Sequence, residues 1–334
     1  MRAGSFAIRF ATETPFLRMI SRIDPLVRLI ALALILASFL PVRGEGRDIA
    51  QAISSGAIFI LFFLNGVRLP RAEVIRGIGN WRLLLPLTLF VFGVMTMAGW
   101  GMMLLTDGFV PPLVALGFLY LGTLPSTVQS ATAYSSLAGG NVATSVVAAA
   151  LLNVLVVFIT APLFSAITGG AGGAMGNDGL IKVFAILLLP FALGQIAQTM
   201  LGGWARDHRA LVTWMDRSSI AIAVYVAFSG AVEEGIWHRL GAGEWALLLA
   251  AAFVMLAFAV VAAWLLGGAL RLERPNRISF LYAGAQKSIA MGAPLAAVLF
   301  PHGVAGMILL PVLVYHMAQL IVSAPLATRL RKSL

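Results

Sequence analysis

Apolar residues run through this chain in long stretches, separated by short polar segments, from residue 24 to residue 328. Ten stretches reach about 20 residues, which is the length an α-helix needs to cross the hydrocarbon core of a membrane. They have to be helical, because every backbone N–H and C=O in hydrocarbon must be bonded within the protein. The pattern therefore predicts an all-α integral membrane protein with spans at 24–41, 49–68, 81–105, 110–138, 141–168, 180–201, 213–232, 244–270, 276–300 and 303–328.

The composition supports this class and removes several others. Of the 334 residues, 60% are hydrophobic and 11% are charged, whereas soluble proteins carry about 25% charged residues. Disordered chains need high charge, and barrel strands alternate apolar and polar residues, so neither class fits. The absence of cysteine excludes disulfides and cysteine-bound metals. With no Walker motif and no nucleophile–base pattern, the sequence predicts neither an ATP-driven pump nor an enzyme.

The basic residues predict how the chain is oriented. Its net charge of +10 is explained by the excess of lysine and arginine in cytoplasmic loops of membrane proteins, so no nucleic-acid partner is expected. With a cytoplasmic N-terminus, most of the 23 basic residues fall on that side, and the opposite side holds only Arg43, Arg47, Lys182 and Arg239. We expect a multi-pass protein of the cell inner membrane, with a cytoplasmic segment 1–23 and a cytoplasmic tail 329–334.

A glycine-rich segment divides the chain into two halves. Residues 169–179 contain the run Gly169-Gly-Ala-Gly-Gly-Ala-Met-Gly176, which is typical of a flexible linker. Five predicted spans precede it (24–168) and five follow it (180–328). Because five is odd, the second half enters the membrane from the opposite side, which is the topology of an inverted repeat.

Two spans at matching positions in the halves have unusual polar content. The fourth contains Gly122–Ser136, with Pro125 among threonines, serines and a glutamine, and the ninth contains Gly284–Pro294. Proline removes a backbone donor and breaks a helix. Small residues and prolines can simply permit tight packing, but glycine- or proline-interrupted spans in corresponding halves are typical of a transporter's binding site. We therefore expect breaks in both spans.

Lys287 is the sharpest single feature of the ninth span. A charge near mid-membrane costs about 3 kcal/mol or more, and the nearest interface lies roughly 15 Å away, at about 1.5 Å per helical residue. Asp107 and Asp216 fall near span ends, so no mid-membrane carboxylate is predicted as its partner. Lys287 is expected to face a polar cavity, an anion, or the carbonyls of an unwound helix.

Other polar residues have simpler interpretations. His316 and Gln319 lie three residues apart, and hence on one helix face, where a helix-packing hydrogen bond is expected. Asn141 precedes an apolar run and is predicted to cap the fifth helix. Asn153 is expected to link helices, and Arg68 to flank the end of a span.

The polar motifs of these spans resemble a known family. The matching stretches are Leu124–Ala131 (LPSTVQSA), Gly140–Ala143 (GNVA), Ala283–Ser288 (AGAQKS), Phe63–Leu69 and Glu234–Trp237. They resemble the bile acid:sodium symporter superfamily. Within it they resemble the SBF-like branch, which includes the seventh member of the human bile-acid transporter family. The resemblance covers nearly the whole chain. It implies ten spans in two inverted five-helix repeats, a core domain with two broken, crossing helices (the fourth and ninth), and a panel domain of the remaining spans.

The resemblance also implies positions for sodium ligands. The family's fifth-helix serine is matched by Ser145, while its next ligand falls on Ala149. The family's fourth-helix pair falls among Gln129, Ser130, Ala131 and Thr132, with a spacing that differs by one residue, so the choice stays open.

The ninth helix departs from the family pattern. Gln286 is retained, the family's glutamate is Tyr282, and the residue after the glutamine is Lys287. Losing the carboxylate removes the strongest ligand for a hard cation, and an ammonium opposes cation binding. We hypothesise that Lys287 takes the place of a bound sodium, which argues against sodium coupling and leaves proton coupling open. No resident cofactor or metal is expected.

The sequence therefore predicts a secondary-active transporter of a small amphipathic organic anion, working by alternating access in a lipid bilayer. The alternative is a non-transporting membrane regulator of ion (calcium) homeostasis or cell-envelope assembly. Oligomeric state is left open. The candidate substrate-binding residues are Thr127, Gln129, Ser130, Lys287 and Ser288; the candidate ion-site equivalents are Gln129, Ser130, Thr132, Ser145, Tyr282, Gln286 and Lys287.

Overall fold

A computed structural model describes residues 24–68, 81–168 and 184–332 of the chain. Within these ranges the elements are helices, with no β-strand. Seven helical stretches there are long and apolar enough to cross a membrane. They comprise α3 (Gly46–Arg68), α5–η1–α6 (Trp81–Leu89, Phe90–Val94, Met95–Thr106), α9 (Val142–Thr168), η2–α11 (Phe184–Leu188, Leu189–Asp207), α12 (Arg209–Glu233), α14 (Ala242–Ala269) and α17 (His302–Lys332).

The three other predicted spans are short or divided. The span 24–41 corresponds to α2 (Pro25–Phe39). The span 110–138 is split into α7 (Pro112–Thr123) and α8 (Gln129–Leu137), and the span 276–300 into α15 (Arg274–Ala285) and α16 (Ile289–Leu299). The predicted helix breaks are therefore confirmed in both places. A one-turn helix, α13 (Ile236–Arg239), joins α12 to α14.

Some predicted boundaries differ from the structure or cannot be compared with it. The segments 1–23 and 169–179 lie outside the described residues, as does the start of the span 180–201. The predicted tail 329–334 begins inside α17, which continues to Lys332. Three basic residues, Arg329, Arg331 and Lys332, form its last turn, where positive charge suits the carbonyl end of a helix.

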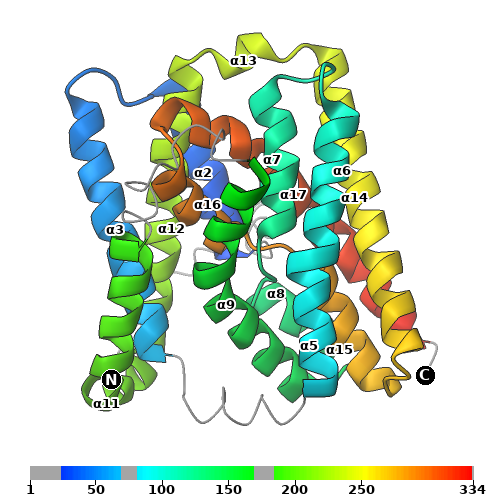
Figure 1. Cartoon of the computed structure of the whole chain (residues 1–334). Helices are drawn as coiled ribbons and strands as arrows, with labels where there is room; N and C mark the ends of the chain where they lie inside the picture. The colour runs from blue at the N-terminus through cyan, green and yellow to red at the C-terminus, as the bar shows by residue number, and fades with distance from the viewer. Residues whose placement is uncertain (1–23, 69–80, 169–183, 333–334) are drawn as a thin grey trace, which may run out of the picture.

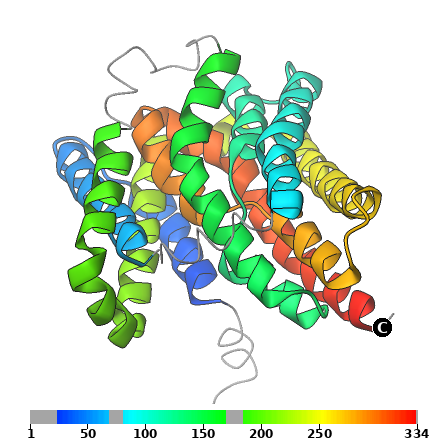
Figure 2. The same ribbon diagram turned by 60° about the horizontal axis from the view of Figure 1, so that its bottom comes forward.

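The helices form two groups that meet along α12 (Figure 1). One group contains α2, α3, α11 and α12, in which α3 packs against both α11 and α12. The other contains α5–α9 and α14–α17, in which α7 packs on α6 and α17, and α15 packs on α14. Helix α12 joins the groups through its contacts with α16 and α17. Figure 2 shows the same two groups after rotation, with α11 and α17 on opposite sides.

Glycines bring the helices within each group close together. A Cβ atom at Gly66 of α3 would overlap the carbonyl oxygen of Phe191 in α11. A Cβ at Gly117 of α7 would lie 2.5 Å from the carbonyl oxygen of Ile308 in α17. Small residues allow such close approach where packing, rather than water exclusion, holds helices together.

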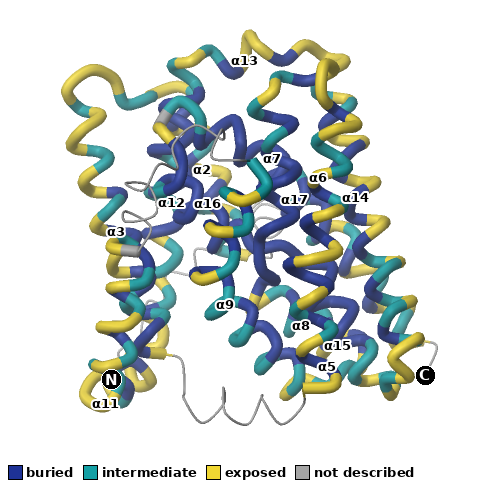
Figure 3. The backbone as a smooth tube through the Cα atoms, viewed as in Figure 1, coloured by how far each residue is buried: buried dark blue, intermediate teal, exposed yellow. Residues whose placement is uncertain are grey.

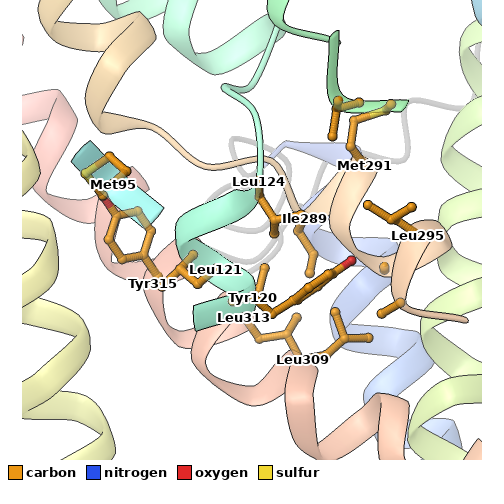
Figure 4. Packing of buried hydrophobic residues seen from close by; sticks show 14 of the residues in the cluster. Met95, Tyr120, Leu121, Leu124, Ile289, Met291, Leu295, Leu309, Leu313 and Tyr315 are labelled. Atoms are coloured by element: carbon orange, nitrogen blue, oxygen red, sulfur yellow. The ribbon is translucent and has the colours of Figure 1, made fainter. Parts of the chain in front are cut away.

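Burial is concentrated around the two divided spans (Figure 3). Large apolar side chains on the outer helices stay exposed, among them Met200 of α11 and Leu265 of α14, as expected for surfaces that face lipid. At the centre, Tyr120, Leu121, Ile289 and Leu313 pack together from α7, α16 and α17 (Figure 4). This core fixes the two helix breaks relative to one another.

Candidate functional site

The first helix break, residues 124–128, separates α7 from α8 and contains Pro125. Unwinding leaves carbonyl oxygens without their helical N–H donors, and a buried carbonyl needs a partner. Each carbonyl oxygen from Gly122 to Ser126 accepts a hydrogen bond from another helix or from the second break. Lys287 Nζ donates to the carbonyls of Gly122 at 2.8 Å and Leu124 at 2.7 Å. Thr160 Oγ1 donates to Thr123 at 2.6 Å, and the Ser288 N–H donates to Pro125 at 2.9 Å. Asn153 Nδ2 donates to Ser126 at 3.1 Å.

The second helix break, residues 286–288, is held by side chains of α17. The amide of Gln319 bonds both backbone groups of Lys287: Oε1 accepts from its N–H at 2.8 Å, and Nε2 donates to its carbonyl at 2.9 Å. His316 Nδ1 lies 3.3 Å from the same carbonyl, and the Tyr315 hydroxyl donates to the Ala285 carbonyl at 2.6 Å. The helix-packing hydrogen bonds expected of His316 and Gln319 are confirmed.

Gln286 joins the two breaks through its side chain. Its Oε1 accepts hydrogen bonds from Thr127 Oγ1 at 2.5 Å and from Ser130 Oγ at 2.6 Å. Its Nε2 donates to Ser323 Oγ of α17 at 3.2 Å. The structure thus brings together three of the residues singled out from the sequence, with every amide atom of Gln286 engaged.

The ammonium of Lys287 is completely buried and bonded to backbone carbonyls. Besides Gly122 and Leu124 at the end of α7, it donates to Val91 at 3.1 Å. Val91 lies in the π-helical segment η1, and Gly122 and Leu124 lie at the negative end of the α7 dipole. The sequence predicts a polar cavity, an anion or the carbonyls of an unwound helix around Lys287, and in the structure its Nζ atom contacts the carbonyls.

Of the other ion-site equivalents, Tyr282 bonds the same residue as Gln286, Ser323, whereas Ser145 bonds a different set of residues. Ser145 Oγ donates to Ser135 Oγ at 2.8 Å and lies 3.1 Å from the Asn141 carbonyl oxygen. The Tyr282 hydroxyl donates to the Ser323 carbonyl at 3.3 Å, and its ring stacks on Tyr134. Thr132 Oγ1 is buried without a hydrogen-bond partner. Among the described residues, no three acidic, histidine or cysteine side chains are grouped as metal ligands would be.

A cavity of about 410 Å³ adjoins the two breaks, within the usual range of small-molecule sites. Thr127, Gln129, Ser130 and Ser288 line it, so four of the five candidate substrate-binding residues face one space. Lys287 does not line it. The opposite wall comes from α2, α3 and α12, and α9 adds an apolar wall of Val146, Ala150, Val154 and Val157.

Charged side chains line the same cavity from the α3–α12 side. Arg68, the last residue of α3, forms an ion pair with Asp216 of α12. Arg217 lies 3.8 Å from Asp24, the residue that caps α2. The interpretation of Arg68 as a mere flank of a span is therefore incomplete. The sequence places Asp216 near a span end and predicts no role for it or for Arg217. The signal in the sequence is two adjacent charges a few residues inside the predicted span 213–232, because charges within a span are costly and typical of functional sites.

Asn153 has two roles. It links α9 to the first break as expected, through Ser126, and it also lines the cavity.

Comparison with known proteins gives the family. The model of the SBF-like CPA transporter family matches residues 24–332. A protein of Escherichia coli K12 named "Putative symporter YfeH" is 36% identical over 312 residues, which cover 93% of each chain. A Pseudomonas aeruginosa protein named "Uncharacterized protein PA2026" is 37% identical over 300 residues, 88% of this chain and 89% of that one.

A more distant relative is the mouse protein named "Sodium/bile acid cotransporter 7". It is 20% identical over 288 residues, 84% of this chain and 83% of its own length. These names and the apolar helices indicate a multi-pass membrane transporter rather than an enzyme. The chain belongs to the SBF-like CPA transporter family.

Proposed function

We propose that this protein is a secondary-active transporter that moves a small amphipathic organic anion by alternating access of the cavity beside the helix breaks. The observation that carries the proposal is the composition of that cavity. It combines an apolar wall on α9 with the hydroxyls of Thr127 and Ser130 and the guanidinium groups of Arg68 and Arg217. Such a lining fits a solute with an apolar body and an anionic head.

The two helix groups suggest how access could alternate. In the proposal, the spans number ten in two inverted five-helix repeats, and α7/α8 and α15/α16 are the fourth and ninth. The group containing α2, α3, α11 and α12 acts as the panel and the other as the core, with the cavity between them. Support comes from the matched breaks and from glycine-mediated packing within each group. The positive-inside pattern supports cytoplasmic termini in the inner membrane.

Sodium coupling fits the breaks poorly. Gln286 Oε1 already accepts two hydroxyl donors, and the Lys287 ammonium bonds the carbonyl oxygens of the first break. A sodium ion there would meet a fixed positive charge and occupied oxygen ligands. We propose that Lys287 replaces the ion as a permanent cation that stabilises the breaks, so that transport is independent of sodium.

A counterflow experiment tests whether solute passes through the cavity. Proteoliposomes preloaded with unlabelled taurocholate are placed in labelled taurocholate, and uptake of label is followed. Val146→Trp fills the cavity from α9, whereas Val142→Trp adds the same bulk one turn earlier, at a position 43% exposed and outside the cavity. We expect exchange in wild type and V142W, and its loss in V146W. Equal exchange in both variants, or none in wild type, would contradict the proposal.

A further inference from the structure

We propose that Asp216 binds the proton that drives transport, and that the anionic group of the solute replaces the Asp216 carboxylate beside Arg68. The inference rests on the proposed function and deepens it by naming the coupling ion and the group that carries it. The charges that line the cavity balance before any solute enters.

The formal charges that line the cavity sum to zero. Asp24 and Asp216 are acidic, and Arg68 and Arg217 are basic. An organic anion that entered this space alone would leave a net negative charge in surroundings of low dielectric constant, which is costly. A proton that enters with the anion removes this cost. The balance therefore favours joint binding of one proton and one negative charge of the solute.

The Arg68–Asp216 pair has the geometry of an exchangeable contact. One carboxylate oxygen of Asp216 pairs with Arg68, while the other, Oδ1, is buried without a hydrogen-bond partner. The Arg68 side chain is 34% exposed, and its Nη2 also donates to Asn65 Oδ1 at 3.0 Å. A buried carboxylate oxygen without a donor favours the neutral acid, since burying a neutral carboxyl group costs much less than burying an unpaired charge. Protonation would leave the guanidinium of Arg68 available for the solute.

The other titratable groups that face Asp216 across the cavity are less suited to this role. Asp24 of α2 is more exposed, and its carboxylate caps that helix by accepting from the Leu26 N–H at 2.7 Å. His316 of α17 is occupied at the second break through Gln319 and the Lys287 carbonyl. Besides these and the two arginines, α11 and α16 contribute only apolar side chains to the lining.

The exchange conserves charge. The Asp216 carboxylate takes up one proton and becomes a neutral acid, and the Arg68–Asp216 ion pair is replaced by a pair between Arg68 and the solute. The net charge of the cavity is zero before and after. A monovalent anion then moves with one proton, and transport is electroneutral. Linkage makes the effect reciprocal: the solute strengthens proton binding as much as the proton strengthens solute binding.

Taurocholate tests the coupling because its sulfonate stays ionised, so that pH acts on the protein and not on the probe. In wild-type proteoliposomes, an inward proton gradient should drive accumulation, and a membrane potential alone should not. In Asp216→Asn, counterflow should persist, the response to the proton gradient should fall at least about tenfold, and uptake should become sensitive to potential. Asp216→Glu keeps a carboxylate and should keep the proton response.

Asp48→Asn is the matched control, because Asp48 is an exposed carboxylate on the same helix as Arg68 and lies outside the cavity. It should behave as wild type. Wild-type exchange that ignores the proton gradient, or a full proton response in D216N, would overturn the coupling proposal and leave the transport proposal standing.

Infrared difference spectroscopy tests the proton site without any transport. Acidification of purified wild-type protein should produce a carboxylic-acid carbonyl band that is missing in D216N and present in D48N. If wild-type protein exchanges no taurocholate, the proposed function fails for this solute, and this spectrum alone decides the proton site. An identical band in wild type and D216N would overturn it.

Discussion

Lys287 and Arg68 are both basic side chains of an apolar helical protein, but their surroundings are opposite. The Lys287 ammonium is fully buried and has three carbonyl partners on segments that meet at the core. The Arg68 side chain is one-third exposed, and its carboxylate partner has an oxygen without a donor. A cation with all its contacts made by backbone stabilises one conformation. A cation with one exchangeable contact can change partner.

This contrast separates structural from functional charge. Variants at the breaks should lose stability first, and activity as a consequence. Variants at the α3–α12 pair should change solute affinity or proton coupling while stability is nearly unchanged.

Lys287→Ala should have the largest effect. It leaves three buried carbonyls without their donor, and each unpaired buried group costs about 1–3 kcal/mol. The thermal unfolding midpoint in detergent should fall the most among these variants, and transport should be lost or become cation-dependent. If the ammonium replaces an ion, sodium chloride should raise the K287A midpoint relative to choline chloride and leave wild type unchanged. Full, sodium-independent transport in K287A would contradict the proposal that Lys287 replaces a bound ion.

Gln319→Leu should have the next largest effect on stability. It removes the amide that bonds both backbone groups of Lys287, and each unpaired buried group costs about 1–3 kcal/mol. The midpoint should fall by less than in K287A. Hydrogen exchange measured by mass spectrometry should increase locally at residues 286–288, and exchange unchanged there would contradict the role of Gln319.

Thr160→Val should have a smaller effect of the same kind. It keeps the shape of the side chain but removes the single donor to the Thr123 carbonyl, which costs about 1–3 kcal/mol. Thr160 does not line the cavity, so taurocholate affinity in the folded fraction should not change. A lowered affinity without any loss of stability would break the division between the two regions.

Arg68→Gln should have the smallest effect on stability and a large effect on transport. A partly exposed ion pair contributes about 0–1 kcal/mol, so the midpoint should stay close to that of wild type. The KM for taurocholate should rise at least about tenfold, because a charged partner of the solute is gone. A midpoint lowered as far as in K287A would assign Arg68 a structural role instead.

The sequence predicts the helix breaks well because their causes are local. Pro125 removes a donor, and the glycine, serine and glutamine residues around Lys287 are poor neighbours for an apolar span. The buried lysine was recognisable from its depth in the span. Its partner Val91 could not be recognised from the sequence, because the residues of the π-helical segment η1, Phe90–Val94, have no distinct pattern.

The charged wall of the cavity could not be predicted in the same way. Arg68 and Asp216 lie 148 residues apart, and each is close to the end of its own span, where charges are common. Only the packing of α3 on α12 brings them together. The positions aligned with family ion ligands also gave a mixed result: Ser130 bonds Gln286, and Tyr282 bonds Ser323 as Gln286 does, whereas Ser145 bonds Ser135.

We propose that the Lys287 ammonium takes the place of a bound sodium ion in an organic-anion transporter. The most direct test is taurocholate accumulation by wild-type proteoliposomes under an inward sodium gradient and under an equal choline gradient, with the proton gradient held the same. We expect equal accumulation in the two conditions. Accumulation that requires sodium would contradict it, and would mean that the oxygens at the breaks bind an ion despite Lys287.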